Sequence, residues 1–159
     1  MRAIDASSLI YAWDNYPLSH FPKLWTWLAD EIEKDDPYVP NAAFIEVGHK
    51  LPDCSAWLVE CECTVATETH QVLQAALAIK QALGIENDKY HPNGVDENDI
   101  LIIATAKTKG RALVSNESRQ PLLPQDKKRW KIPAVCALDA AGVACNDFLE
   151  YFRASGKVF

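Results

Sequence analysis

The amino-acid sequence predicts an α/β protein with a central parallel sheet and helices on both of its faces. Strand-like and helix-like segments alternate along the whole chain, which is typical of parallel sheets. Segment 2–4 is short and, after Arg2, apolar, and segment 100–106 is apolar almost all the way round a helix, so both belong in the interior. With 159 residues, 48% of them hydrophobic, we expect a single domain over residues 1–159.

The expected elements follow from the period of the apolar residues. In order, they are a strand over 2–4, two helices between 9 and 32, a brief strand over 38–40, a helix from Asn41 that contains Glu46, a strand over 61–66, a helix over 69–83, a helix over 100–106, a strand over 112–115, a helical stretch from about Ala134 and a last helix over 147–153.

Turn and cap residues set the boundaries between these elements. Pro17 and Pro22 interrupt the helical pattern of the N-terminal segment, because proline breaks a helix. Asn41 is expected to cap the helix that follows it. Gly84 and Gly110 stand where two helices should end, as glycine often does.

The chain has the features of a soluble cytoplasmic protein. Its start lacks the apolar run of a secretory signal, and no stretch approaches the roughly eighteen apolar residues of a membrane span. Its five cysteines are odd in number and form no Cys-x-x-Cys pair. Cys61 and Cys63 share one face of an expected strand, but no second ligand pair follows them. We therefore expect reduced cysteines that act as small buried residues.

A net charge of −6 argues against a general nucleic-acid coat, because phosphate binding favours a basic surface. It does not exclude a nuclease, since a site that collects divalent cations must itself be acidic. Basic residues gather in segments 107–111 and 127–131, where they could meet a phosphate backbone. Solvated surface positions explain either segment equally well.

Three acidic residues fall where parallel α/β proteins form their sites. Asp5 follows the first strand at the start of a helix that a serine is expected to cap, Asp99 opens the buried helix, and Glu46 lies on a helix near the first strand's end. Each has a structural explanation of its own: a cap, an exposed helical residue, or a residue favoured by the helix dipole. Together they border a core that rejects unpaired charge. Such oxygen ligands suit Mg²⁺ or Mn²⁺.

Four ordered blocks resemble the signature blocks of PIN domains. They are Ile4-Asp5-Ala-Ser7-Ser-Leu9, Val39-Pro40 with Glu46 in the helix that follows, Asp99-Ile-Leu-Ile-Ile-Ala-Thr-Ala106, and Leu113-Val-Ser-Asn-Glu117. The ending, with Lys131-Ile-Pro-Ala-Val-Cys136 and a final aromatic helix, further resembles an uncharacterised bacterial and archaeal branch of that family.

The resemblance implies a three-layer α/β/α fold and a metal-dependent ribonuclease. Asp5, Glu46 and Asp99 match the family's main ligands for one or two Mg²⁺ or Mn²⁺ ions, and Ser7 matches a hydroxyl that supports the first aspartate. In the implied reaction, a metal-activated water attacks phosphorus in line, and the products carry a 5′ phosphate and a 3′ hydroxyl.

The fourth acidic position departs from the family pattern. Where the family usually has Thr-x-Asp, this chain has Ser-Asn116-Glu117. Glu117 is the best match, with Asn116 in a supporting role, and Asp96 is a competing candidate that could instead be a helix cap. The four histidines receive no catalytic role, although His49 shares a helix face with Glu46 and could touch substrate.

The resemblance also suggests partners: an RNA substrate, an antitoxin protein that pairs with this chain as a toxin, and a second copy in a homodimer. Two other classes of function stay open. One is a PIN-like binding module that has lost metal activity and grips a protein or RNA. The other is a phosphatase with Asp5 as nucleophile, although the second aspartate of haloacid-dehalogenase-like enzymes is missing two residues later.

Overall fold

The structure is a computed structural model that describes residues 1–159. Its strands are β1 (Ala3–Ile4), β2 (Val39–Pro40), β3 (Val65–Ala66), β4 (Ala112–Val114) and β5 (Ala144–Asn146). Its helices are α1 (Ala6–Asn15), α2 (Pro22–Glu33), α3 (Asn41–Lys50), α4 (Pro52–Glu60), α5 (His70–Leu83), α6 (Glu97–Thr108), the 3₁₀ turn η1 (Lys127–Arg129), α7 (Ile132–Cys136) and α8 (Phe148–Ala154).

A short parallel sheet forms the centre of the molecule, as the sequence predicts. Its strand order is β1-β4-β5, with Ile4 opposite Val114 and Val114 opposite Asn146. The β2-β3 pair is also parallel and joins the first sheet through a bridge between Ala3 and Tyr38. Because all these strands run the same way, the residues that follow β1 and β4 emerge at one edge.

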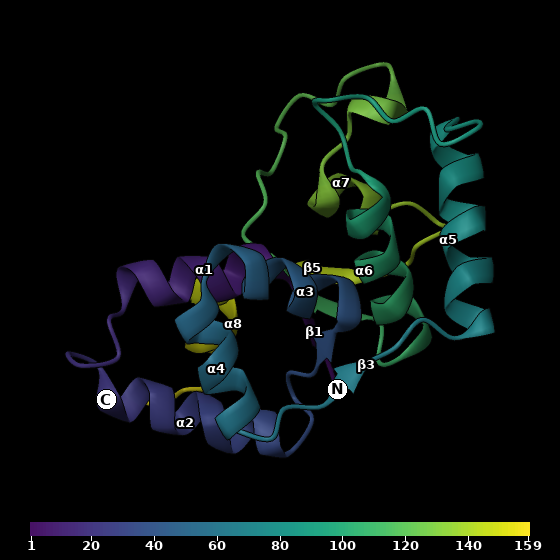
Figure 1. The fold of residues 1–159 in the computed structure, drawn as a ribbon. Coiled ribbons are helices and arrows are strands. Elements are labelled where there is room, and N and C mark those ends of the chain that lie inside the picture. The colour runs from purple at the N-terminus through teal and green to yellow at the C-terminus, as the bar shows by residue number, and fades with distance from the viewer.

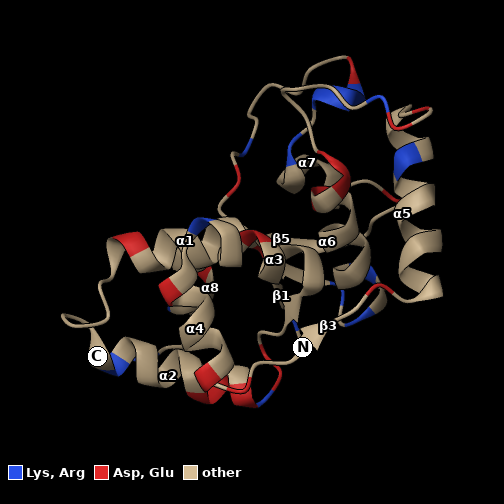
Figure 2. Ribbon diagram, viewed as in Figure 1, with Lys and Arg blue, Asp and Glu red and all other residues tan.

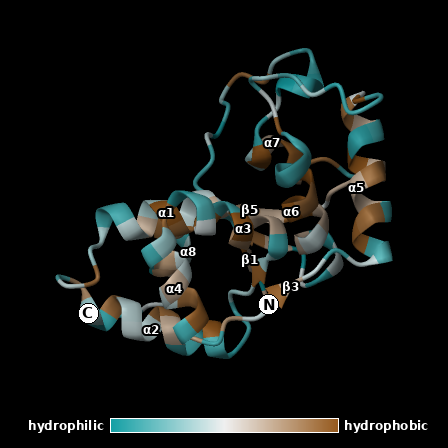
Figure 3. Cartoon of the chain, in the orientation of Figure 1, coloured by the Kyte–Doolittle hydropathy of each residue, from teal (hydrophilic) through white to brown (hydrophobic).

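Helices cover the sheet, which confirms the α/β/α architecture. Helices α5 and α6 pack against each other on one side, whereas α1, α2, α4 and α8 gather on the other (Figure 1). Helix α3 contacts both α1 and α6 and so links the two groups. In Figure 3, β1, the middle of α6 and much of α7 are hydrophobic, and α5 shows hydrophobic and hydrophilic patches in alternation along its length. The core therefore lies around β1, β4 and α6.

The best-predicted element is α5, where local chemistry and packing agree. The side chain of Thr69 accepts a hydrogen bond from the Val72 amide, which caps the helix start. Gly84 ends the helix at φ +74°, a left-handed conformation in which a side chain would be strained. Helix α6 is capped by Lys109, and Gly110 follows at φ +94°, where an added Cβ would lie 2.0 Å from the Met1 carbonyl oxygen.

The expected strand over 61–66 is wrong in its first four residues. Pro52 is not a break but the first residue of α4, a position at which its missing N–H costs nothing. Cys54 and Leu58 lie one helical turn apart and are both buried. Cys61 is therefore the C-terminal cap of α4, and it does not share a strand face with Cys63.

Two expected helix caps are also wrong. Asn41 is the first residue of α3 and follows Pro40 at the cap position, and its amide donates to Glu68 at 3.2 Å instead. No serine caps α1, because the residue at that position is Asp5, whose side chain makes no capping hydrogen bond. Strand β5 is absent from the sequence prediction, since Ala144–Asn146 is an edge strand without a run of apolar residues.

Candidate functional site

Asp5 is a buried carboxylate at the carboxyl edge of the sheet. It follows β1, and the residue is only 2% exposed. The Ser7 hydroxyl donates to Oδ2 at 2.5 Å and the Ser115 hydroxyl donates to the same oxygen at 2.9 Å. Burial raises the pKa of Asp5 to about 6, and the negative charges of Glu117 and Glu46 raise it further, while the two hydroxyl hydrogen bonds lower it. Ionisation of Asp5 is therefore less favourable here than it is for an aspartate in water.

Asn116 joins the ends of β1 and β4 and holds the Ser7 hydroxyl in place. Its backbone N–H donates to Ser7 Oγ at 2.9 Å. Its side-chain oxygen accepts hydrogen bonds from the Ser8 hydroxyl at 2.7 Å and from the Phe148 amide at 3.0 Å. These contacts place Asn116 beside Asp5 without making it a direct partner of the carboxylate. They agree with a supporting position for Ser7 and Asn116, while their role in metal binding stays a prediction.

Asp99 is the second carboxylate with a strongly raised pKa. It lies in the first turn of α6, half-buried, and forms a capping box with Asp96. Its Oδ2 accepts the Asp96 N–H at 3.0 Å, and Asp96 Oδ1 accepts the Asp99 N–H at 2.9 Å. Burial raises the pKa of Asp99 to about 7, and the charges of Asp96, Asp5 and Glu117 also raise it, against the backbone hydrogen bond that lowers it.

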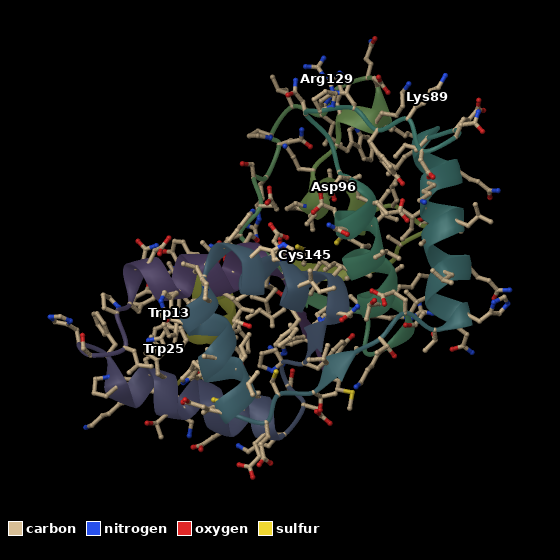
Figure 4. The ribbon with its side chains drawn as sticks, viewed as in Figure 1. Trp13, Trp25, Lys89, Asp96, Arg129 and Cys145 are labelled. Atoms are coloured by element: carbon tan, nitrogen blue, oxygen red, sulfur yellow. The ribbon has the colours of Figure 1, made fainter.

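Three of the four predicted ligands, Glu46, Asp99 and Glu117, line one open cavity of about 460 Å³, together with the competing candidate Asp96. Its lining is Ile45, Glu46, His49, Lys50, Asp96, Asn98, Asp99, Glu117, Lys131 and Ile132. Acidic residues mark the first turn of α6 beside α7 in Figure 2, and Figure 4 shows Asp96 at that end of the helix. Asp5 is not among the lining residues, although its charge and those of Asp99 and Glu117 act on one another. The structure thus brings Glu46, Asp99 and Glu117 to one cavity, with Asp5 behind its wall.

Glu46 and Glu117 differ in their partners. Lys50 Nζ lies 2.5 Å from Glu46 Oε1, one helical turn further along α3. The hydrogen bond to Glu46 raises the pKa of Lys50, and the charges of Glu46, Glu117 and Asp5 raise it further. No lysine or arginine forms an ion pair with Asp5, Asp99 or Glu117. Asp5, Asp99 and Glu117 thus lack a direct basic partner.

The donor set suits a divalent cation through its chemistry. In the arrangement described here, no three acidic, histidine or cysteine side chains are close enough to hold one ion directly. Mg²⁺ does not need three, because it usually keeps several waters and binds through one or two carboxylates. Two carboxylates, buried Asp5 and half-buried Asp99, have raised pKa values and no basic partner, so they are oxygen ligands whose mutual repulsion a cation relieves. These residues fit a hydrated Mg²⁺ or Mn²⁺.

Sequence reasoning missed Lys50, which lines the cavity, and Ser115, which bonds to Asp5 behind it, and it named Lys131 only as part of a basic segment. Lys50 could have been found, since it lies four residues after Glu46 and such a pair meets on a helix face. Lys131 lines the cavity at the start of α7, but nothing in its sequence neighbourhood separates it from its basic neighbours. Ser115 needed the pairing of β1 with β4, which no local pattern gives. His49 does line the cavity.

Four other basic residues, Lys89, Lys107, Lys109 and Arg129, do not line the cavity. Lys107 donates to the Ala140 carbonyl, and the Lys109 ammonium lies 4.5 Å from the centre of the Tyr38 ring. Arg129 and Lys89 lie at the outer end of the molecule, beyond Asp96 (Figure 4). All five cysteines are free, with Cys54 and Cys136 buried, which agrees with the expected reduced residues. No helix of the chain combines the length and the apolar character that crossing a membrane requires.

By fold and site, the protein is an α/β protein with a carboxylate cluster at the carboxyl edge of a parallel sheet. It belongs to the family described as Domain of unknown function (DUF4411), whose model matches residues 3–159. No curated protein matches the chain. The family has no assigned function, so the resemblance to PIN domains stays a prediction.

Proposed function

We propose that this protein is a metal-dependent endoribonuclease that hydrolyses phosphodiester bonds of RNA. One observation supports the proposal above all others. Asp99 lines the cavity and Asp5 lies buried behind its wall, neither forms an ion pair with a basic residue, and the pKa of each carboxyl is strongly raised. Strongly perturbed carboxylates gather at functional sites, because the fold has no use of its own for such repulsion.

In this proposal Asp5, Asp99, Glu117 and Glu46 hold Mg²⁺ or Mn²⁺, directly or through water. When bound, the cation supplies the acidification of a water molecule and positive charge beside the departing oxygen. The chain's own residues orient the site: the Ser7 and Ser115 hydroxyls fix Asp5 Oδ2 and leave Oδ1 free of both. The capping box similarly occupies Asp99 Oδ2 and leaves Oδ1 outside that bond.

The rim of the cavity is suited to a polyanion. His49 and Lys131 line it beside the acids, and neither is engaged in an ion pair. A phosphate of the RNA can meet these two side chains while the acids stay on the cation. This local arrangement allows RNA binding in a chain whose net charge is −6.

The test is cleavage of a labelled RNA in Mn²⁺ or Mg²⁺, with and without EDTA. We expect cleavage only with the cation, and products that carry a 5′ phosphate. Asp99→Asn should lower the rate by more than about a hundredfold, because the loss of an outer-shell partner alone costs about 10–100-fold. The matched control is Asp30→Asn, an exposed acid on α2 that should cleave like wild type. Cleavage that persists in EDTA, or in Asp99→Asn, would refute the proposal.

A second candidate is a catalytically inactive binding module for protein or RNA. It is favoured by the Lys50–Glu46 ion pair and by the absence of three acids close enough to hold one ion directly. In the same assay this candidate predicts RNA binding in a gel shift without any cleavage in Mn²⁺. Phosphate release from a phosphomonoester in Mg²⁺ would instead favour the phosphatase alternative with Asp5 as nucleophile.

The proposal extends to the partners: we propose that the protein is the toxin of a toxin–antitoxin pair and forms a homodimer. Exposed apolar side chains on α5, Leu73 and Leu77, leave surface for such contacts. Sedimentation at up to high micromolar concentration tests the dimer, and a monomer throughout would refute it. Growth arrest on expression, relieved by Asp99→Asn, tests the toxin.

A further inference from the structure

Lys50 is the basic side chain in direct contact with the carboxylate cluster. It lies in the last turn of α3, and its ammonium is 2.5 Å from Glu46 Oε1. The Lys50 side chain is 60% exposed, whereas that of Glu46 is 28% exposed. The stem of Lys50 therefore reaches in from the surface, and its charge lies over the acid that faces the cavity.

The field at this ammonium comes from several acids. Glu46, Glu117 and Asp5 all act on Lys50, although only Glu46 touches it. Lys131 lines the same cavity without an ion pair to any acid. Lys50 thus holds the place at the α3 side of the cluster that a cation would otherwise take.

The charges around the cavity limit how many divalent cations fit. Asp5 and the acids of the lining, which are Glu46, Asp96, Asp99 and Glu117, face the two lysines Lys50 and Lys131. The net negative charge of these side chains is larger than the charge of one divalent cation and smaller than the charge of two. A second divalent cation beside Glu46 would have to displace the ammonium, or sit next to it against like-charge repulsion.

We propose that Lys50 takes the place of a second divalent cation, so that the site binds a single hydrated Mg²⁺ or Mn²⁺ on the side of Asp99 and Glu117, in front of the buried Asp5. This inference rests on the metal site of the proposed function. Lys50 is then a positioning residue: it neutralises Glu46 and directs the one cation to the other carboxylates. An ordinary surface pair one turn apart would have no effect on metal binding.

The experiment is Mn²⁺ binding to the full chain, measured by equilibrium dialysis and by the electron paramagnetic resonance signal of free Mn²⁺. We expect one Mn²⁺ per wild-type chain. Lys50→Met, which keeps the stem and removes the charge, should bind a second Mn²⁺ at least about tenfold more tightly than wild type does, since removing one like charge at this range exceeds a tenfold effect. Lys50→Arg should bind one. In the double variant Glu46→Gln/Lys50→Met the second site should be lost again.

The matched control is Lys34→Met, because Lys34 forms a similarly exposed ion pair, with Glu31, on α2 away from the cavity. It should bind one Mn²⁺, like wild type. Melting in EDTA checks that each variant is folded. The inference is overturned if wild type binds no Mn²⁺ or two, or if Lys50→Met binds like wild type. One Mn²⁺ in wild type and two in Lys50→Met, without RNA cleavage by either, would refute the nuclease and leave this inference standing.

Discussion

Two regions of the molecule have opposite effects on the stability of the fold: one is an aromatic cluster and the other is the carboxylate cluster. Between α1, α2 and α4, Trp25 lies edge-on to Trp13 and Trp57, with ring centres 5.1 and 4.9 Å away. Figure 4 shows Trp13 and Trp25 next to each other in this helical part. At the carboxyl edge of the sheet, Asp5 and Asp99 instead lie where burial and neighbouring charge both oppose their ionised forms.

The aromatic cluster therefore stabilises the fold, whereas the carboxylate cluster lowers its stability. Edge-on aromatic pairs attract each other beyond the area they bury. Buried like charges repel, and a fold retains them only if the surrounding structure over-determines their positions. The carboxylate cluster is therefore the region whose loss should cost the fold least, and whose ligand should help it most.

The largest expected effect on stability is in the aromatic region. Trp25 is buried, and its indole N–H donates to the Tyr16 carbonyl at 2.6 Å. Trp25→Ala should lower the free energy of unfolding by about 3–5 kcal/mol, because it leaves a cavity and an unpaired carbonyl. Urea unfolding measures this change. A loss below about 1 kcal/mol would show that the aromatic cluster does not stabilise the fold as its geometry indicates.

The next effect is a dependence on pH that the carboxylate cluster causes. Unfolded Asp5 releases its proton near the ordinary value of 3.8, whereas folded Asp5 keeps it to about 6. Between these values the folded state binds more protons, so stability in EDTA falls as the pH rises through this window. The free energy of unfolding should therefore be about 3 kcal/mol higher below about pH 4 than above about pH 6, because each pH unit between the two pKa values accounts for about 1.4 kcal/mol.

Asp5→Asn isolates this contribution, because an amide oxygen can still accept the two serine hydroxyls. In EDTA the variant should melt at or above wild type at pH 7.5, and the advantage should shrink or reverse at pH 4. Asp30→Asn, the exposed control, should follow wild type at every pH. If Asp5→Asn melts well below wild type at pH 7.5, the carboxylate is a structural partner and the comparison of the two regions fails.

A bound metal ion should raise the free energy of unfolding by slightly less than the pH effect does. An ion that binds only the folded state adds about 2.7 kcal/mol at a hundred times its dissociation constant. Wild type and Trp25→Ala should both gain this free energy in Mn²⁺, since Trp25 is not among the residues that line the cavity. Asp5→Asn should gain little. An equal gain in all three proteins, seen in calorimetric melts, would place the metal away from Asp5.

The fold was predictable where local signals and packing agree. Thr69 and Gly84 bound α5 as expected, and the apolar residues of α6 mark it as buried. Helix α4 was not predicted, because a proline such as Pro52 can mark either the end of a helix or its first residue. Strand β5 was not predicted, because two of its three residues, Ala144 and Asn146, are exposed.

The site was predictable as a set of positions but not as a set of contacts. The strand-end position of Asp5 and the helix start at Asp99 are local features of the sequence. The bond from Ser115 to Asp5 spans 110 residues, and only the parallel pairing of β1 with β4 creates it. The same holds for the placement of Asp5 behind the cavity wall, which separates it from the lining acids.

The smallest expected effect concerns the hydroxyl that supports Asp5. Ser7 donates to Asp5 Oδ2 and accepts the Asn116 N–H, so Ser7→Ala removes two hydrogen bonds and should cost about 1–2 kcal/mol. The hydrogen bond from Ser7 also lowers the pKa of Asp5, so its loss should raise that pKa above about 6. The folded variant must then carry a less stabilised charge at high pH, and its deficit should be larger at pH 8 than at pH 5. Ser19→Ala, which removes an exposed hydroxyl bonded only to His20, is the control and should be neutral. Urea unfolding at both pH values measures the difference, and a deficit that does not change with pH would mean that Ser7 acts on the Asn116 backbone alone.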